Sequence, residues 1–165
     1  MEKMNTIYGN ISNGQFLSAG YYYKDNLNFL CKMIKNDNSA AIRDAAKLME
    51  PLIPENACLI PMPSHLGFPT YMLEVAKEIA KIRKDVFYVD CLESNTHISR
   101  YYCKKLDISA ENTLMCMMGS IPQVYIPVVI ENFIDTGYTA NIALETTGAK
   151  LIVTIAASSI AGDVP

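Results

Sequence analysis

The sequence predicts a single α/β domain with a parallel sheet, helices on both faces of the sheet and an N-terminal hairpin and helical extension. Three observations predict this class. Residues 57–157 alternate short apolar runs with helical patterns, as crossover connections between parallel strands do. Asn13-Gly14 separates two β-prone runs, which is typical of a hairpin. The chain has 165 residues, of which 50% are hydrophobic and 19% charged, and this composition fits one globular core.

The first 56 residues are predicted to form the extension. The hairpin pairs residues 6–11 with residues 15–23 around the Asn-Gly turn. Apolar residues then recur at helical spacing over 27–34 and again over 42–49. Asp25 stands where it could cap the first of these helices. We find no repeat and no linker, so we expect one domain over 1–165, with residues 57–165 as its core.

The core is predicted as strands and helices in alternation. In chain order we expect a strand over 57–62, a helix from Pro69 to about Lys84, a strand over 86–92, strands over 113–118 and 126–130, a helix over 139–147 closed by Gly148, and a last strand over 150–157. The segment 93–109 is polar without a clear period. We interpret it as a long loop that could serve as a lid, with disorder as the alternative.

The composition excludes several functions. The formal net charge is −3 and no basic tract is present, so we do not expect nucleic acid as a partner. No apolar run is long enough to cross a bilayer and the N-terminus lacks a signal-peptide core, which predicts a cytoplasmic protein without membrane contact. The five cysteines show no C-x-x-C spacing and the two histidines have no ligand-like neighbours, so no metal cage is expected.

Ligands of parallel α/β sheets bind at the carboxyl ends of the strands, which here predicts 63–67 and 131–139. In the second segment Glu131 ends a strand, Asp135-Thr136-Gly137 makes a turn and Thr139 opens a helix. The amide groups of a helix N-terminus suit a phosphate, and the glycine lets the backbone approach it. Glu131 could accept hydrogen bonds from sugar hydroxyls, so the pattern predicts a ribose 5-phosphate ligand. The alternative is a plain corner in which Asp-Thr-Gly caps the helix.

Glu-Asn-Phe-Ile-Asp-Thr-Gly-Tyr-Thr, residues 131–139, resembles the phosphoribosyl-pyrophosphate loop of the type I phosphoribosyltransferases, closest to their hypoxanthine-guanine branch. Residues 59–67, Leu-Ile-Pro-Met-Pro-Ser-His-Leu-Gly, are similar to that family's first core strand and pyrophosphate loop. With the two helices before it, this stretch also looks like the ComF-type competence proteins. The resemblance implies a phosphoribosyltransferase-like, Rossmann-like core.

The resemblance implies a role for each matching residue. The 5-phosphate would be bound by Asp135, Thr136, Gly137, Tyr138 and Thr139, the ribose hydroxyls by Glu131 and Asn132, and pyrophosphate by Ser64, His65, Leu66 and Gly67, with Arg100 contacting it from the lid. Mg²⁺ is implied as a cofactor that bridges the diol and the pyrophosphate. Glu131 and Asp135 would be the catalytic residues, with Asp135 taking a proton from the incoming base, unless Asp135 is only a helix cap.

Two departures from the family leave the function open. Asn132 replaces the second acidic residue of the loop, and only residues 158–165 follow the last strand, which is too little for a base-binding hood. The N-terminal part would have to supply the hood, with Tyr21-Tyr22-Tyr23 as the first candidate for stacking a base. A homodimer would be common for this fold.

We therefore carry three hypotheses. The first is a Mg²⁺-dependent transferase of nucleotide metabolism, which moves ribose 5-phosphate between phosphoribosyl pyrophosphate or a nucleoside monophosphate and a nucleobase or related nitrogen nucleophile. The second is a nucleotide-binding or phosphoribosyl-binding regulator without catalysis. The third is a ComF-like accessory protein, which the weakly acidic charge does not favour.

Overall fold

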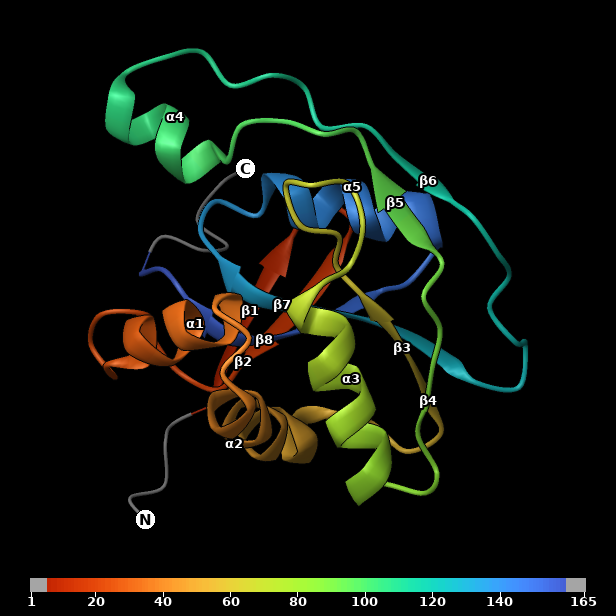
Figure 1. Cartoon of the computed structure of the whole chain (residues 1–165). Coiled ribbons are helices and arrows are strands. Elements are labelled where there is room, and N and C mark those ends of the chain that lie inside the picture. The colour runs from red at the N-terminus through yellow and green to blue at the C-terminus, as the bar shows by residue number, and fades with distance from the viewer. Residues whose placement is uncertain (1–5, 160–165) are drawn as a thin grey trace.

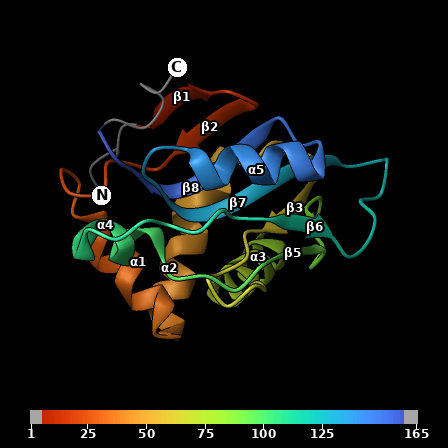
Figure 2. The ribbon, with the colours of Figure 1, turned by 90° about the horizontal axis from the view of Figure 1, so that it is seen from above.

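The computed structural model describes residues 6–159 and consists of three layers (Figures 1 and 2). A six-stranded sheet forms the middle layer. Helices α1 (Leu27–Lys35), α2 (Ser39–Met49) and α3 (Tyr71–Ile82) pack on one face, and α5 (Tyr138–Thr147) packs on the other. The predicted α/β class with helices on both faces is confirmed.

The sheet is mixed but mostly parallel. Its strands run in the order β1 (Ile7–Ile11), β2 (Gly14–Ser18), β8 (Leu151–Ala157), β7 (Ile126–Ile134), β3 (Ala57–Pro61) and β4 (Phe87–Tyr88). Only the β1–β2 pair is antiparallel, which confirms the predicted hairpin. Because β2 pairs with β8, the hairpin extends the main sheet. The carboxyl ends of β3, β7 and β8 lie at one edge, and residues that follow them can share a site.

The alternation of side chains along the strands divides the core in two. Leu59 and Val128 contribute to a cluster with α1, α2 and α3, whereas their neighbours Ile60 and Val129 contribute to a cluster with α5. All four side chains are fully buried. A strand that is covered on both faces buries every side chain, so its sequence is a continuous apolar run. Burial of the parallel strands on both faces therefore explains the apolar runs in the sequence.

The N-terminal helices begin as predicted, but one cap differs. The side chain of Asn38 accepts a hydrogen bond from the Ala41 amide at 2.9 Å and caps α2. Asp25 does not cap α1, because its carboxylate accepts a hydrogen bond from the Tyr21 amide at 2.6 Å. Asn26, with a φ of 58°, makes the turn into α1. The prediction for Asp25 is therefore wrong, since Asp25 stabilises the turn before the helix.

The segment between α3 and β7 departs furthest from the prediction. The strand expected over 86–92 contributes only Phe87–Tyr88 to the main sheet, and Leu92 begins a separate strand, β5 (Leu92–Ser94). β5 pairs antiparallel with β6 (Met115–Met117). Leu92 is fully buried in the hydrophobic cluster on the α5 side of the sheet. The β5–β6 pair therefore packs against that face of the sheet.

The expected structureless loop over 93–109 is also wrong, because it contains β5 residues and a short helix, α4 (Arg100–Leu106). α4 stands outside the three layers (Figures 1 and 2). Cys103 is its buried anchor. No helix in the part of the chain that the structure describes has both the length and the apolar character of a membrane span.

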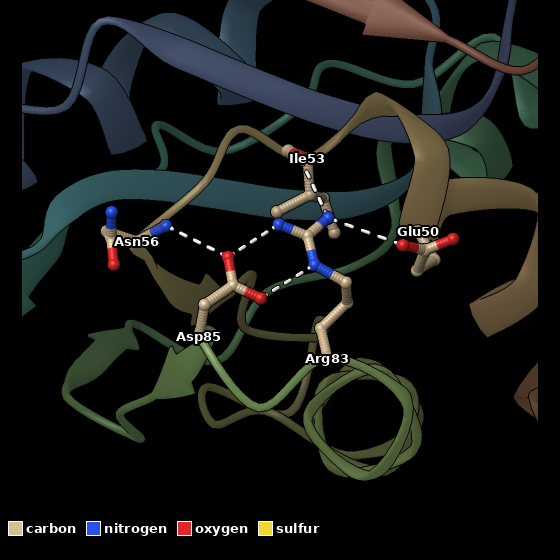
Figure 3. A network of polar contacts seen from close by, with 5 residues as sticks. All are labelled: Glu50, Ile53, Asn56, Arg83 and Asp85. Atoms are coloured by element: carbon tan, nitrogen blue, oxygen red, sulfur yellow. Dashed lines mark hydrogen bonds and ion pairs between the residues drawn. The ribbon is translucent and has the colours of Figure 1, made fainter.

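An ionic network joins the connection between α3 and β4 to the segment between α2 and β3, at the amino edge of the sheet (Figure 3). The guanidinium of Arg83 donates to both carboxylate oxygens of Asp85, at 2.8 and 2.6 Å, and to Glu50 and the Ile53 carbonyl. Asp85 also accepts from the Asn56 amide at 3.1 Å. The bidentate guanidinium holds the pKa of Asp85 well below its usual range. This network stabilises the edge opposite the carboxyl ends of the strands.

Candidate functional site

A cavity of about 500 Å³ lies at the carboxyl edge of the sheet. Every residue from Glu131 to Ala140 lines it, and Ser64 and His65 line it from the loop after β3. Lys35 at the end of α1, Tyr71 in α3, and His97, Ser99, Cys103, Lys104, Ile108 and Ala110 in and around α4 complete the lining, together with Pro63. We call this space the first cavity. The segments that follow β3 and β7, far apart in sequence, thus meet at the carboxyl ends of the strands, as predicted for a parallel sheet.

The N-terminus of α5 faces this cavity with amide groups. The first turn of any helix has N–H groups without intrahelical partners, and here Thr139 and Ala140 supply two of them. No hydrogen bond from either amide to another described residue occurs. The Thr136 hydroxyl accepts from the Tyr138 amide at 3.4 Å, and the first turn contains no acidic residue. The helix dipole therefore favours an anion at this end.

Asp135 does not act as the helix cap that the sequence analysis left open. The N-cap of α5 is Gly137, without a side-chain capping bond. The Asp135 carboxylate lies 3.8 Å from the Lys104 ammonium of α4, and its carbonyl accepts from the Ser158 hydroxyl at 2.8 Å. The carboxylate is partly exposed at the cavity, so it is available to a ligand.

Gly137 is favoured by a contact inside the protein, and the predicted approach of its backbone to a ligand stays a prediction. Its φ is +87°, which favours glycine, and a Cβ atom there would lie 2.9 Å from the Ile11 side chain. Ile11 belongs to the hairpin core, so the glycine allows close packing between α5 and β1. The residue lines the cavity, but its missing side chain makes room for the protein itself.

Glu131 and Asn132 extend β7 beyond the predicted strand end, because β7 continues to Ile134. Glu131 is partly buried, and removal from water raises its pKa to about 7. The backbone N–H of Asn132 donates a hydrogen bond to Glu131 Oε1 at 2.9 Å. This bond and the positive charge of Lys35 both oppose the rise in pKa. The Glu131 carboxyl thus carries only part of its charge at neutral pH.

Asn132 is 4% exposed, and its Nδ2 has no hydrogen-bond partner among the described residues. The Asn132 carbonyl accepts from the Cys31 thiol at 3.4 Å. Burial raises the pKa of Cys31 to about 12 and also raises the pKa of Tyr71, so both groups stay neutral beside Glu131. A buried side-chain amide without a hydrogen-bond partner costs free energy of folding. A bound ligand that accepts a hydrogen bond from Nδ2 would explain why this group is present.

The structure places only half of the predicted pyrophosphate loop at the cavity. Ser64 and His65 line it, whereas Leu66 and Gly67 do not. The Leu66 amide donates to the Ser64 hydroxyl at 3.2 Å, and the Gly67 amide donates to the Ser64 carbonyl at 2.9 Å. In this conformation these two amides are used within the loop and are not directed at a ligand. Leu66 and Gly67 therefore do not line the cavity, and their contact with pyrophosphate stays a prediction.

Arg100 is the first residue of α4, and its side chain lies outside the described part of the structure. Lys104, the residue after the buried Cys103, approaches Asp135. Sequence reasoning missed Lys35 and Tyr71 as cavity residues. Both reach the cavity through helix packing, and the sequence carries no local signal for that.

A second cavity of about 620 Å³ adjoins the first. Both are lined by Lys35, Ser99, Lys104, Asn132, Phe133 and Asp135. The second cavity alone is lined by Tyr22, Tyr23, Lys32, Asn36, Tyr102, Lys105 and Ser158. Two of the three tyrosines of the predicted stacking candidate thus lie next to the predicted ribose phosphate site.

The described residues contain no group of three or more His, Cys, Asp or Glu side chains that could hold a metal ion on its own. The cavity does carry oxygen ligands in Glu131, Asn132 and Asp135. Mg²⁺ is commonly bound through one or two carboxylates together with substrate phosphates. This donor set fits an ion that arrives with a phosphorylated ligand.

Comparison with known proteins gave no relatives. A scan against protein-family models found no match, and a search of curated proteins found no significant one.

Proposed function

We propose that the protein binds a ribose 5-phosphate group in the first cavity and, as a transferase, moves it from phosphoribosyl pyrophosphate to a nitrogen nucleophile. The observation that carries the proposal is the unbroken lining of this cavity by Glu131–Ala140, from a carboxylate at one end to an uncapped helix N-terminus at the other. A volume of about 500 Å³ is also within the range of small-molecule sites.

The two ends of the lining suit the two ends of the ligand. The amides of Thr139 and Ala140, with the hydroxyls of Thr136 and Thr139, would bind the 5-phosphate. The Glu131 carboxyl and the side-chain Nδ2 of Asn132 would bind the ribose hydroxyls, one as acceptor and one as donor. Ser64 and His65 would lie toward the pyrophosphate.

The chemistry would be a displacement at the anomeric carbon. A bond forms between this carbon and the acceptor nitrogen, and the bond from the carbon to the pyrophosphate oxygen breaks, so that pyrophosphate leaves with the electron pair. Mg²⁺, when bound with the substrate, would neutralise charge on the leaving group. Asp135 can accept the proton of an N–H acceptor, and Lys104 beside it would balance the carboxylate charge. The other residues act by positioning the reactants.

A second candidate is binding without catalysis. Two observations favour it: Leu66 and Gly67 use their amides within their own loop, and Asn132 provides no second carboxylate. A regulator that senses a phosphoribosyl compound needs the α5 end of the cavity but not the pyrophosphate loop. The two candidates therefore share the phosphate site and differ in turnover.

One experiment separates the transferase, the regulator and a protein that binds no phosphoribosyl compound in this cavity. We would titrate the protein with phosphoribosyl pyrophosphate, with and without Mg²⁺, and then measure pyrophosphate release with a panel of bases. Thr136→Val with Thr139→Val should weaken binding by about tenfold or more, because hydrogen bonds to charged groups are lost. Thr146→Val, in the last turn of the same helix, is the matched control. Binding without release for every base supports the regulator, and no binding refutes both.

A further inference from the structure

The second cavity has a composition that the ribose phosphate site does not explain. It lies between α1, α4 and the end of β7, and four of its lining residues are lysines: Lys32, Lys35, Lys104 and Lys105. Asp135 is the only carboxylate among the described lining residues. The chain as a whole has 14 basic and 17 acidic residues, so this cavity inverts the charge balance of the molecule.

Helix electrostatics accounts for only part of this cluster. Lys32 and Lys35 lie in the last turn of α1, and Lys104 and Lys105 lie in the last turn of α4, where cations stabilise helix C-termini. That explains the position of each lysine along its helix. It does not explain why two helices about seventy residues apart in sequence present these ends to one cavity.

The lysine charges are also poorly balanced by the protein. Lys104 lies 3.8 Å from Asp135, in an exposed pair. Within the described residues, Lys32, Lys35 and Lys105 have no carboxylate within ion-pair distance. A bound anion would balance the charge of these four ammonium groups.

Aromatic side chains supply the remaining walls. Tyr22, Tyr23, Tyr102 and Phe133 line the cavity. The Tyr22 ring packs against the Phe133 ring with centroids 4.2 Å apart and against the Tyr23 ring edge-on at 4.8 Å. Tyr23 and Tyr102 are 71% and 56% exposed, so their rings have surface left for a ligand. Flat rings of this kind favour a planar ligand by stacking.

The two cavities meet at Asn132, Phe133 and Asp135. The buried Nδ2 of Asn132, which lacks a partner among the described residues, lies at this boundary and is a donor that a second ligand could also satisfy. A molecule in the second cavity would therefore be next to one in the first. This is the position that an acceptor of the ribose 5-phosphate group needs.

We propose that the second cavity binds the acceptor, and that this acceptor is a planar nitrogen heterocycle carrying an anionic substituent such as a carboxylate. The role of this ligand as the acceptor rests on the proposed function. Its flat ring and its negative charge are inferred from the cavity lining alone. The aromatic walls select a flat ring, and the lysines of α1 and α4 select a negative charge on it.

The test uses matched pairs of probes that differ in charge alone. Pyridine-3-carboxylate is compared with pyridine-3-carboxamide, and pyrimidine-2,4-dione-6-carboxylate is compared with pyrimidine-2,4-dione-6-carboxamide. Each is titrated into the full chain by calorimetry, with and without ribose 5-phosphate. We expect at least one acid to bind about tenfold more tightly than its neutral partner, which corresponds to about 1.4 kcal/mol.

The variant Lys32→Gln with Lys105→Gln changes lysines that line only the second cavity. It should lose most of the preference for the acid, while its affinity for the neutral probe and for ribose 5-phosphate stays unchanged. Lys47→Gln, on the exposed face of α2, is the control and should behave as the original protein. Unchanged binding of the neutral probe also shows that the cavity is intact.

Two results would overturn the inference: equal affinity for acid and neutral probe in both pairs, or a preference for the acid that survives in the double variant. Failure of the proposed function looks different. In that case ribose 5-phosphate does not bind, while the preference for the acid and its loss in the double variant remain measurable.

Discussion

Glu131 shows how a single residue is tuned by its place in the fold. Its carboxyl follows a buried strand segment, and burial raises its pKa to about 7 although Lys35 and the Asn132 amide oppose the rise. In an unfolded chain the pKa of a glutamate is about 4.3. The native state therefore binds more protons than the unfolded state between these two values. Stability conferred by the protonated form is present at low pH and is lost as pH rises toward 7.

Glu131→Gln removes this dependence. Gln keeps an oxygen for the Asn132 amide but carries no charge, so the variant should match the original protein near pH 4 and exceed it above pH 7. We expect a gain of about 2 kcal/mol in the free energy of unfolding at pH 8, less than the full pKa difference gives because part of the side chain is solvated. Urea denaturation across pH 4–8 measures it. Parallel curves for the two proteins would contradict the pKa of Glu131.

Asn132 gives a second residue-scale prediction. Its buried Nδ2 lacks a partner among the described residues, and such a group costs about 1–3 kcal/mol. Asn132→Leu, of similar volume, should raise the free energy of unfolding by about 1 kcal/mol and weaken binding of ribose 5-phosphate. Thermal unfolding and calorimetric titration measure the two effects. A variant that is less stable than the original protein would mean that the amide is satisfied in the folded state.

At the scale of elements, the corner between β7 and α5 holds the phosphate site together. β7 runs to Ile134 and α5 begins at Tyr138, so Asp135, Thr136 and Gly137 make the whole connection. Such a short connection keeps the helix N-terminus close to the end of β7. The glycine that permits it is packed against Ile11 of the hairpin.

Gly137→Ala should therefore destabilise the fold more than Gly148→Ala. Both glycines have a positive φ, +87° and +73°, but a Cβ atom at position 137 would lie 2.9 Å from Ile11, whereas at position 148 it would meet nothing within 4 Å. Position 148 is expected to cost about 1 kcal/mol for the backbone strain alone, and position 137 more. Chemical denaturation of the two variants compares them directly. Equal losses would show that the contact with Ile11 relaxes freely.

The sequence predicts elements well where one periodic pattern has one solution. Asn13-Gly14 identifies the hairpin, and the apolar spacing identifies α1 and α2, because these signals are local. It fails over 86–109, where β4 has two residues and α4 has seven. Such short elements are fixed by tertiary burial of Leu92 and Cys103, and no local pattern of that length distinguishes them from a loop.

The residues of the candidate site were also predictable only where a local pattern or a general rule of the fold places them. Glu131, Asn132 and Asp135–Thr139 are contiguous, and a strand–turn–helix pattern places them together. Ser64 and His65 follow from the rule that strand ends of a parallel sheet meet at one edge. Lys35 comes from a helix end that only three-dimensional packing brings to the cavity. The internal hydrogen bonds of Leu66 and Gly67 depend on the fold of their own loop.

At the scale of the whole molecule, structural stabilisation and the candidate site lie at opposite edges of the sheet. The network of Arg83, Asp85 and Glu50 (Figure 3) joins elements at the amino edge. Both cavities lie at the carboxyl edge. The separation means that the two can be changed independently, because distant sites usually contribute additively.

Arg83→Met keeps the aliphatic stem but removes the hydrogen bonds to Asp85, Glu50 and the Ile53 carbonyl. The pKa of Asp85 is held low by Arg83, so this contribution is present at neutral pH and is lost as pH falls through the native-state pKa. We expect a lower unfolding temperature at pH 7, a smaller deficit in strong acid and unchanged ligand affinity. Calorimetry at both pH values tests it, and a change in affinity would show that the edges are coupled.

Both candidate functions require that the N-terminus of α5 binds a phosphate. Amide chemical shifts recorded by NMR during a titration with ribose 5-phosphate test this most directly. We expect saturable shifts centred on the amides of residues 136–140, with smaller changes at Glu131 and Asn132 and none near Arg83. Saturable binding whose shifts fall elsewhere, or no binding at millimolar ligand, would contradict it.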